Sequence, residues 1–235
     1  MNRFHQELLA EMEKHKGTAG YAGGVMGTQK TCYQVNIPYR RKIARNFIKK
    51  HPELTLRKLI DLLDSLFAGK SHEEVTVAGL LLEYLPKIKE QLDPRCLDHW
   101  LNYTEGWCEV DTLCQSNWTG KIVLLKWPEW KGLLNTLAVD KNVHKRRASL
   151  VILNKAVRQS DDTRLSKMAF RNIGLLKKEK DILITKAISW LLRSLIEKHR
   201  MEVEKYLQEN RNSLPKIAVR EVNNKLTTGK KYTKS

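Results

Sequence analysis

Apolar residues at helical spacing recur through almost the whole chain, and this pattern constrains the fold more than any other feature. Four alanines lie inside such patterns, each followed by further apolar positions: Ala78, Ala148, Ala187 and Ala218. The intervals between them are 70, 39 and 31 residues, so the first has room for two units. Units of this length, each an antiparallel helix pair with a small residue where helices approach, are typical of HEAT-like solenoids. The sequence therefore predicts a single all-α solenoid domain, residues 1–235, with a concave face.

Caps and prolines set the ends of the predicted helices. Ser71 and Glu74 have capping-box spacing, in which each side chain satisfies a backbone amide of the other residue. Pro38 fits a first helical turn, where its missing N–H has no partner anyway. Helices are predicted at residues 1–16, 38–50, 54–67, 71–85, 93–103, 107–117, 121–138 (entered or kinked at Pro128), 142–158, 161–178, 181–199, 200–210 and 214–227. Residues 228–235 are expected to form a frayed basic tail.

Residues 17–36 interrupt the helical pattern. Five glycines and the β-favouring run from Thr31 to Val35 predict a loop or a short hairpin there. Such a segment in a helical protein often forms a lip over a functional site, and a disordered connector is the alternative. The sequence leaves both open.

The charge balance points to a phosphate-bearing partner. The chain has 43 Lys and Arg against 26 Asp and Glu, which gives a net charge of +17. A protein this basic most often meets nucleic acid or a membrane surface, although a cation-rich solvated surface gives the same numbers. No spanning helix is expected, because the apolar run from Ile182 to Ile196 is broken by Lys186 and Arg193.

Cysteine usage and the first residues of the chain predict a cytoplasmic protein. The four cysteines (Cys32, Cys96, Cys108, Cys114) have neither Cys-x-x-Cys spacing nor a histidine at zinc spacing, so we expect reduced thiols and no metal site. The N-terminal residues contain no apolar signal core. A monomer is the default expectation, and nothing calls for a cofactor or a membrane.

Basic residues recur at matching positions of the predicted units. They crowd the start of the helix at 142–158, precede Ala187 and follow Ala218: Lys141, His144, Lys145, Arg146, Arg147, Lys186 and Arg220. If matching positions line the concave face, these cations form a track for a phosphate backbone. The competing interpretation is ordinary surface charge, and the common register favours the track.

Trp107 and Asp111 are four residues apart, so on a helix an indole and a carboxylate share one face. Gly106 favours a helix start at Trp107, where a carboxylate keeps its charge readily. Taken alone, this spacing is common, and a core tryptophan beside a solvated aspartate is the simpler interpretation. Periodicity also assigns Trp190 to the core, together with Trp100, Trp118, Trp127 and Trp130 as packing residues.

Several ordered motifs resemble the AlkD-type DNA alkylation repair family, the HEAT-like DNA glycosylases. Gly106-Trp-Cys-Glu-Val-Asp111 is similar to the family's Trp-x-x-Val-Asp, and Lys186-Ala-Ile-Ser-Trp-Leu-Leu-Arg193 to its Lys-Ala-Ile-Gly-Trp-x-Leu-Arg. Weaker matches are His144 to Leu150, Val35 to Arg41 and Ala218 to Glu221. The resemblance covers about residues 21–226, with Tyr21 a loose match to a family tyrosine. It implies a right-handed superhelix with a basic concave face.

The resemblance also implies roles for individual residues. Asp111 would be the catalytic carboxylate, and Trp107 and Trp190 the active-site aromatics, in hydrolysis of the N-glycosidic bond of N3- or N7-alkylated purines. DNA contacts would come from the cations of the matching motifs: Arg40, Arg41, Lys145, Arg146, Arg147, Lys186, Arg193 and Arg220. The partner would be alkylated or distorted double-stranded DNA. His144 stands where the family usually has tryptophan, so a non-catalytic protein that binds damaged, bent or branched DNA is the alternative.

Overall fold

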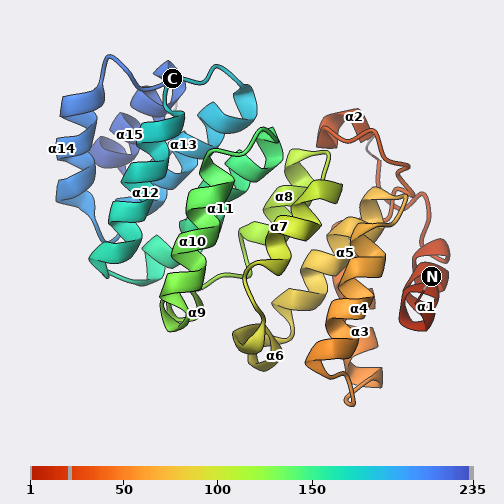
Figure 1. Ribbon diagram of the computed structural model, residues 1–235. Coiled ribbons are helices and arrows are strands. Elements are labelled where there is room, and N and C mark those ends of the chain that lie inside the picture. Colours follow the sequence, from red (N-terminus) through yellow and green to blue (C-terminus); the bar gives the residue numbers. More distant parts are fainter. Residues whose placement is uncertain (1, 21–22, 233–235) are drawn as a thin grey trace. The chain divides into compact units, whose positions relative to one another are not determined.

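The computed structural model describes residues 2–20 and 23–232, and this part of the chain is all-helical (Figure 1). Internal contacts divide the chain into two compact units, residues 1–117 and 118–235. No helix among the described residues is long and apolar enough to cross a membrane. The prediction of an all-α chain is confirmed, whereas the superhelical arrangement and the basic concave face stay predictions.

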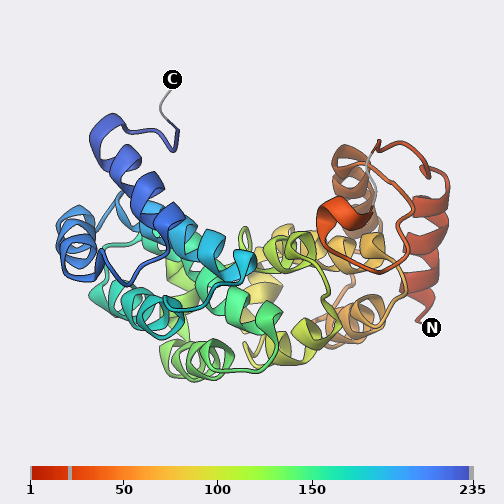
Figure 2. The same ribbon diagram turned by 90° about the horizontal axis from the view of Figure 1, so that it is seen from above.

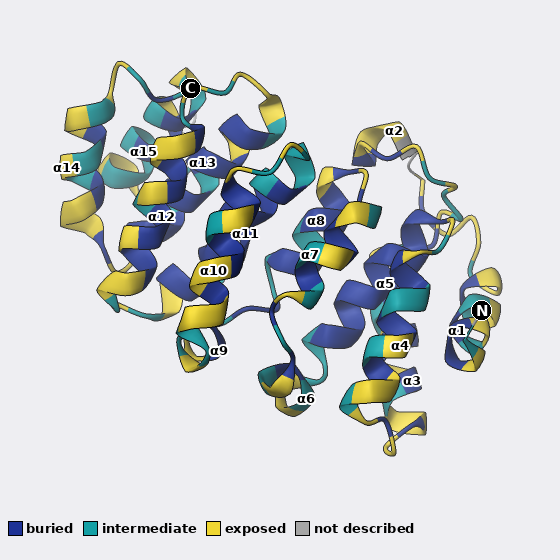
Figure 3. Cartoon of the chain, in the orientation of Figure 1, coloured by how far each residue is buried: buried dark blue, intermediate teal, exposed yellow. Residues whose placement is uncertain are grey.

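The first unit is built around one buried helix. Its helices are α1 (Arg3–Glu13), α2 (Gly23–Met26), α3 (Ile37–Lys50), α4 (Leu56–Phe67), α5 (His72–Glu83), α6 (Pro86–Gln91), α7 (Cys96–Trp100), a 3-10 turn (Leu101–Tyr103) and α8 (Trp107–Cys114). Helix α5 is buried along nearly its whole length and packs against α3, α4 and α8 (Figure 3). The predicted capping box starts it: Ser71 Oγ accepts from Glu74 N at 3.2 Å, and Glu74 Oε2 from Ser71 N at 2.7 Å.

The second unit consists of α9 (Gly120–Leu125), α10 (Trp127–Ala138), α11 (Val143–Gln159), α12 (Thr163–Leu176), α13 (Ile182–Leu195), α14 (Arg200–Asn210) and α15 (Lys216–Thr228). Side chains of Asn142, Asp162 and Asp181 cap α11, α12 and α13 by accepting from backbone N–H groups. Helix α13 lies between α11 and α15, and it has extensive contacts with both (Figures 1 and 2).

The recurring alanines lie where helices pack. Ala78, Ala148, Ala187 and Ala218 are all completely buried, on α5, α11, α13 and α15 respectively. Gly79, next to Ala78, approaches α8 so closely that a Cβ there would lie 3.0 Å from the backbone of Thr112. Helix α8 thus occupies part of the 70-residue interval that the sequence left for an extra unit.

Three of the four predicted packing tryptophans are fully buried. Trp118 and Trp130 pack against each other with ring centroids 4.9 Å apart, and Trp100 stacks on Phe67 at 5.3 Å. Trp100 Nε1 also donates to Asp64 Oδ1 at 2.6 Å, which satisfies its polar edge. Trp127 is half-buried, at the start of α10. The backbone breaks at Lys126, between α9 and α10, as Pro128 predicted.

Residues 17–20 and 23–36 contain the short helix α2 and otherwise loop backbone, and these described residues form no hairpin. Among the described residues the only β-type pairing is an isolated bridge between Thr31 and Ser71. Tyr21 lies outside the described residues. Helix α6 was not predicted, because six residues with two prolines nearby give little periodicity. Residues 233–235 of the predicted tail also lie outside the described residues.

Candidate functional site

Trp107 and Asp111 lie on the same face of α8, as their spacing predicts. Trp107 is the first residue of the helix and is 37% exposed, which is unusual for a tryptophan. Asp111 follows one turn later and is half-buried. The N-cap position is Gly106, so no side chain covers the start of the helix. An exposed tryptophan and a half-buried aspartate therefore lie on one face of α8.

Helix α2 holds the indole in place. Trp107 Nε1 donates to the carbonyl oxygen of Val25 at 3.1 Å. The backbone of Met26 passes directly over Gly106, where any Cβ atom would clash with the Met26 carbonyl oxygen and lie 3.0 Å from the backbone of Gly27. Met26 and Gly27 thus pack against the start of α8, and glycine at 106 is required for this approach.

We expect Gly106→Ala to lower the free energy of unfolding by about 1 to 3 kcal/mol, because the added methyl group must push α2 away from α8. Urea unfolding measures the effect. Gly24→Ala is the matched control, since a Cβ at Gly24 has no neighbour within 4 Å. Equal stability of the two variants would show that α2 does not pack on α8 in solution.

A buried ion pair lies beneath this face of α8. His72 Nδ1 lies 3.0 Å from Glu109 Oε1, and both side chains are completely buried. Burial disfavours the charged imidazolium, but contacts with Cys108 and Glu109 outweigh it and raise the pKa of His72 to about 9. Burial likewise opposes ionisation of Glu109, yet bonds from His72, the Glu105 amide and Thr28 lower its pKa. The pair joins α5 to the side of α8 that faces away from Trp107 and Asp111.

Two further carboxylates fix the loop that follows α2. Glu73 accepts from the amides of Tyr33 and Val35, at 2.9 and 3.3 Å. Glu105 accepts from the amide of Gln29 at 3.0 Å. Since backbone N–H groups in a loop need partners, these carboxylates determine its path. Sequence reasoning did not identify them as positioning groups, because each acts on residues about 40 or more positions away.

Helix α13 presents the second predicted cluster. Lys186, Trp190 and Arg193 follow one another at intervals of four and three residues, so they share one side of the helix. Lys186 is exposed and Trp190 is half-buried, while Ile188, Leu191 and Leu192 are fully buried. Trp190 is thus not the sealed core residue that periodicity alone predicts.

A buried carboxylate anchors Arg193. Glu221 Oε2 lies 3.5 Å from Arg193 Nε and accepts from Ser189 Oγ at 2.6 Å. Burial lowers the pKa of Arg193, and the charges of Glu221 and Tyr232 oppose that change. The guanidinium keeps part of its surface exposed while its position is fixed. Arg220, the neighbour of Glu221, is exposed.

The basic residues of α11 are engaged by the protein itself. Arg146 makes a two-pronged contact with Glu179, at 2.8 and 3.1 Å, and donates to the carbonyls of Asp140 and Lys141. Arg147 is 5% exposed and donates to Leu183 O at 2.6 Å, which ties α11 to α13. Lys145 is buried, with its Nζ 3.7 Å from Asp140. Arg146, which is half-buried, keeps more exposed surface than its two neighbours.

The two predicted arginines of α3 differ in burial. Arg40 is 2% exposed and donates to Thr76 Oγ1 at 2.6 Å, inside the first unit. Arg41 is half-buried, and its Nη1 lies 3.1 Å from both carboxylate oxygens of Glu83. The position of Arg40 favours a structural role over contact with a phosphate, since a buried guanidinium presents almost no surface to a ligand.

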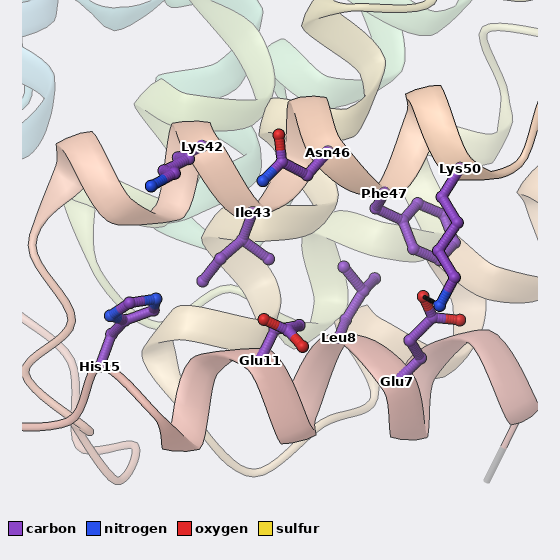
Figure 4. Close-up of a pocket in the computed structure, with 9 residues that line it drawn as sticks. All are labelled: Glu7, Leu8, Glu11, His15, Lys42, Ile43, Asn46, Phe47 and Lys50. Carbon is purple, nitrogen blue, oxygen red and sulfur yellow. Dashed lines mark hydrogen bonds and ion pairs between the residues drawn. The ribbon is translucent and has the colours of Figure 1, made fainter.

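A hollow of about 360 Å³ lies between α1 and α3, away from all the residues named above (Figure 4). Its floor is apolar, with Leu8, Ile43 and Phe47. Carboxylates of α1 face amino groups of α3 across it, and Glu7 Oε1 lies 2.8 Å from Lys50 Nζ. Glu7 and Lys50 thus pair with each other in the hollow, and none of the predicted site residues lines it.

Two comparisons with known proteins bear on the family and the fold of the chain. A family model described as DNA alkylation repair enzyme matches residues 5–226. A solved structure described as a predicted DNA alkylation repair enzyme from Enterococcus faecalis is similar in fold, with a TM-score of 0.71 over 88% of this chain and 93% of that chain. The two sequences are 19% identical, so the likeness concerns the fold. No protein with a curated description matches the chain.

Proposed function

Because the chain belongs to the DNA alkylation repair enzyme family, we propose that it is a DNA glycosylase that hydrolyses the N-glycosidic bond of N3- and N7-alkylated purines. The observation that carries the proposal is the face of α8, where an exposed tryptophan and a half-buried aspartate lie one turn apart. Both are held by neighbouring groups that belong to the same unit: α2 contacts Trp107, and the His72–Glu109 pair supports the helix from beneath.

The chemistry needs only one carboxylate. An N3- or N7-alkylated purine already carries a positive charge, so the base leaves as a neutral molecule when it takes the electron pair of the bond. No general acid is required. Positive charge then grows on the deoxyribose, and Asp111 stabilises it and orients a water molecule, whose oxygen forms the new bond to the sugar. The proton of that water passes to Asp111 or to solvent.

The two predicted aromatics account for selectivity in this proposal. Trp107 holds the cationic nucleotide against the electron-rich face of its ring, a contact worth about 0.5 to 2 kcal/mol, and the family resemblance implies the same role for Trp190. A neutral guanine gains much less from such contacts. The exposure of Trp107 fits a shallow site that leaves the base near the duplex, in contrast to a deep pocket for a flipped base.

Among the predicted phosphate contacts, those on α13 and α15 are best placed. Lys186 and Arg220 are exposed and have no ion pair within the described residues, and Arg193 keeps part of its guanidinium accessible. We assign to these three the direct contacts with the DNA backbone, which fix register without reading sequence. Arg147 and Lys145 then act as supports that position α11 and α13.

The proposal is tested by incubating the purified chain with duplex DNA that contains 7-methylguanine and measuring release of the base. Release above the spontaneous rate, with little release of unmodified guanine, is the expected result. No release from any duplex with an N3- or N7-alkylated purine would refute the glycosylase proposal. If the chain releases no base but binds four-way junctions more tightly than linear duplex, the non-catalytic alternative replaces the glycosylase proposal.

A further inference from the structure

The residues that follow α15 fold back beside the cluster on α13. Helix α15 ends at Gly229, whose φ of 74° is in the left-handed region that favours glycine, and the chain reverses there (Figure 2). Asn224 Nδ2 donates to the carbonyl of Lys231 at 3.3 Å, and Lys225 Nζ to that of Gly229 at 2.9 Å. Residues 229–232 are therefore attached to α15, whereas the sequence predicts a frayed end.

This reversal brings a second cation to the carboxylate that anchors Arg193. Lys231 Nζ lies 3.5 Å from Glu221 Oε1, and Arg193 Nε lies 3.5 Å from Oε2 of the same group. Glu221 is buried, whereas the side chain of Lys231 is 37% exposed. One carboxylate thus sets the positions of two cations that are 38 positions apart in the sequence.

We propose that Arg193 and Lys231, held side by side by Glu221, form a clamp for the phosphate backbone of the DNA, and that the C-terminal segment is thereby part of the DNA-binding surface. The inference rests on the proposed function. Arg193 Nε donates to Ser189 Oγ at 3.4 Å, and the remaining guanidinium donors make no hydrogen bond within the described residues. A guanidinium has five N–H donors and an ammonium three, so both cations keep donors for a phosphate while Glu221 holds them by charge. Two cations on one carboxylate leave a net positive charge facing solvent.

Tyr232 extends the clamp. It is exposed, and its ring lies 4.6 Å from Lys231 Nζ. A tyrosine hydroxyl donates readily to phosphate oxygens, and its ring limits the motion of the lysine beside it. The stretch from Lys230 to Tyr232 therefore adds both charge and a directed donor to the surface around Arg193.

The test measures binding of a short fluorescent duplex at several salt concentrations for the wild-type chain, Lys231→Gln and Lys205→Gln. Lys205 is the matched control, because it is also a lysine paired with a carboxylate, Glu209, and lies on the exposed side of α14. We expect Lys231→Gln to weaken binding on the order of 5-fold near physiological salt and to reduce the slope of log K against log salt by about 0.9, the value for one lost phosphate contact. Lys231→Arg should keep the wild-type affinity and the wild-type slope of log K against log salt.

The possible outcomes separate this proposal from the broader one. If Lys231→Gln and Lys205→Gln behave alike while the wild-type chain binds with steep salt dependence, the clamp is refuted and DNA binding stands. Tighter binding by Lys231→Gln would also refute the clamp, because it would mean that the segment competes with DNA. If the wild-type chain shows no salt-dependent binding at all, the proposed function itself fails.

Discussion

Asp111→Asn will release 7-methylguanine from duplex DNA at least about 100-fold more slowly than the wild-type chain, the usual loss when one group that stabilises developing charge is removed. The amide is close to the carboxylate in size, so the fold of α8 should be unchanged. What it lacks is the negative charge that stabilises the sugar cation and orients the water. Single-turnover base release, at a chain concentration above that of the DNA, measures the effect on the chemical step.

The Asp111→Asn variant should still bind the same duplex. Loss of a negative charge on the protein does not weaken the attraction between the protein and the DNA phosphates. Asp61→Asn is the matched control, because Asp61 is an exposed aspartate on α4 of the same unit. An Asp111→Asn chain that releases the base as fast as Asp61→Asn would remove Asp111 from the mechanism.

Local sequence patterns predicted most helices of this chain. Capping at Ser71, prolines in first turns and apolar spacing each act within one or two helical turns, so they can be read without knowledge of tertiary contacts. The same holds for Trp107 and Asp111, whose common face follows from helical geometry. Helix α2 could not be predicted, because four residues held by contacts with Gly106 and Trp107 carry no periodicity of their own.

The state of the basic residues was beyond local reasoning for a different reason. Whether a cation is available to DNA depends on the carboxylates and carbonyls that meet it in the folded chain. Arg146 meets Glu179, Arg147 meets Leu183 O and Arg193 meets Glu221, at separations of roughly 30 residues. A count of charges and their register could not distinguish Lys186, which is exposed, from Lys145, which is buried.

Glu109→Gln will lower the free energy of unfolding by about 3 to 5 kcal/mol, the usual result when one partner of a buried ion pair is removed. The variant removes the carboxylate that pairs with His72, so the buried ring must give up its proton at pH 7, and it also weakens the acceptor for the Glu105 amide. Glu13→Gln is the control, because Glu13 is exposed and pairs with Lys16 at the surface, where an ion pair contributes about 0 to 1 kcal/mol. Urea unfolding at pH 7 gives both values.

The same pair predicts how stability depends on pH. The pKa of folded His72 is raised from its ordinary 6.5 to about 9, so its contribution is complete below about pH 6.5 and is lost as pH rises through 9. The pKa of Glu109 is lowered, so its contribution is present above its ordinary value of 4.5 and is lost as pH falls through the folded value. The free energy of unfolding of the wild-type chain should therefore fall between pH 7 and pH 10.

In Glu109→Gln the alkaline fall should be smaller, because burial without a carboxylate favours the neutral imidazole already at pH 7. A titration of His72 by NMR would follow this directly, with a wild-type midpoint near 9 and a much lower one in the variant. A wild-type midpoint near 6.5 would contradict the buried ion pair. The double variant His72→Gln, Glu109→Gln should lose less stability than the two single changes added together, since it leaves no unpaired charge in the interior.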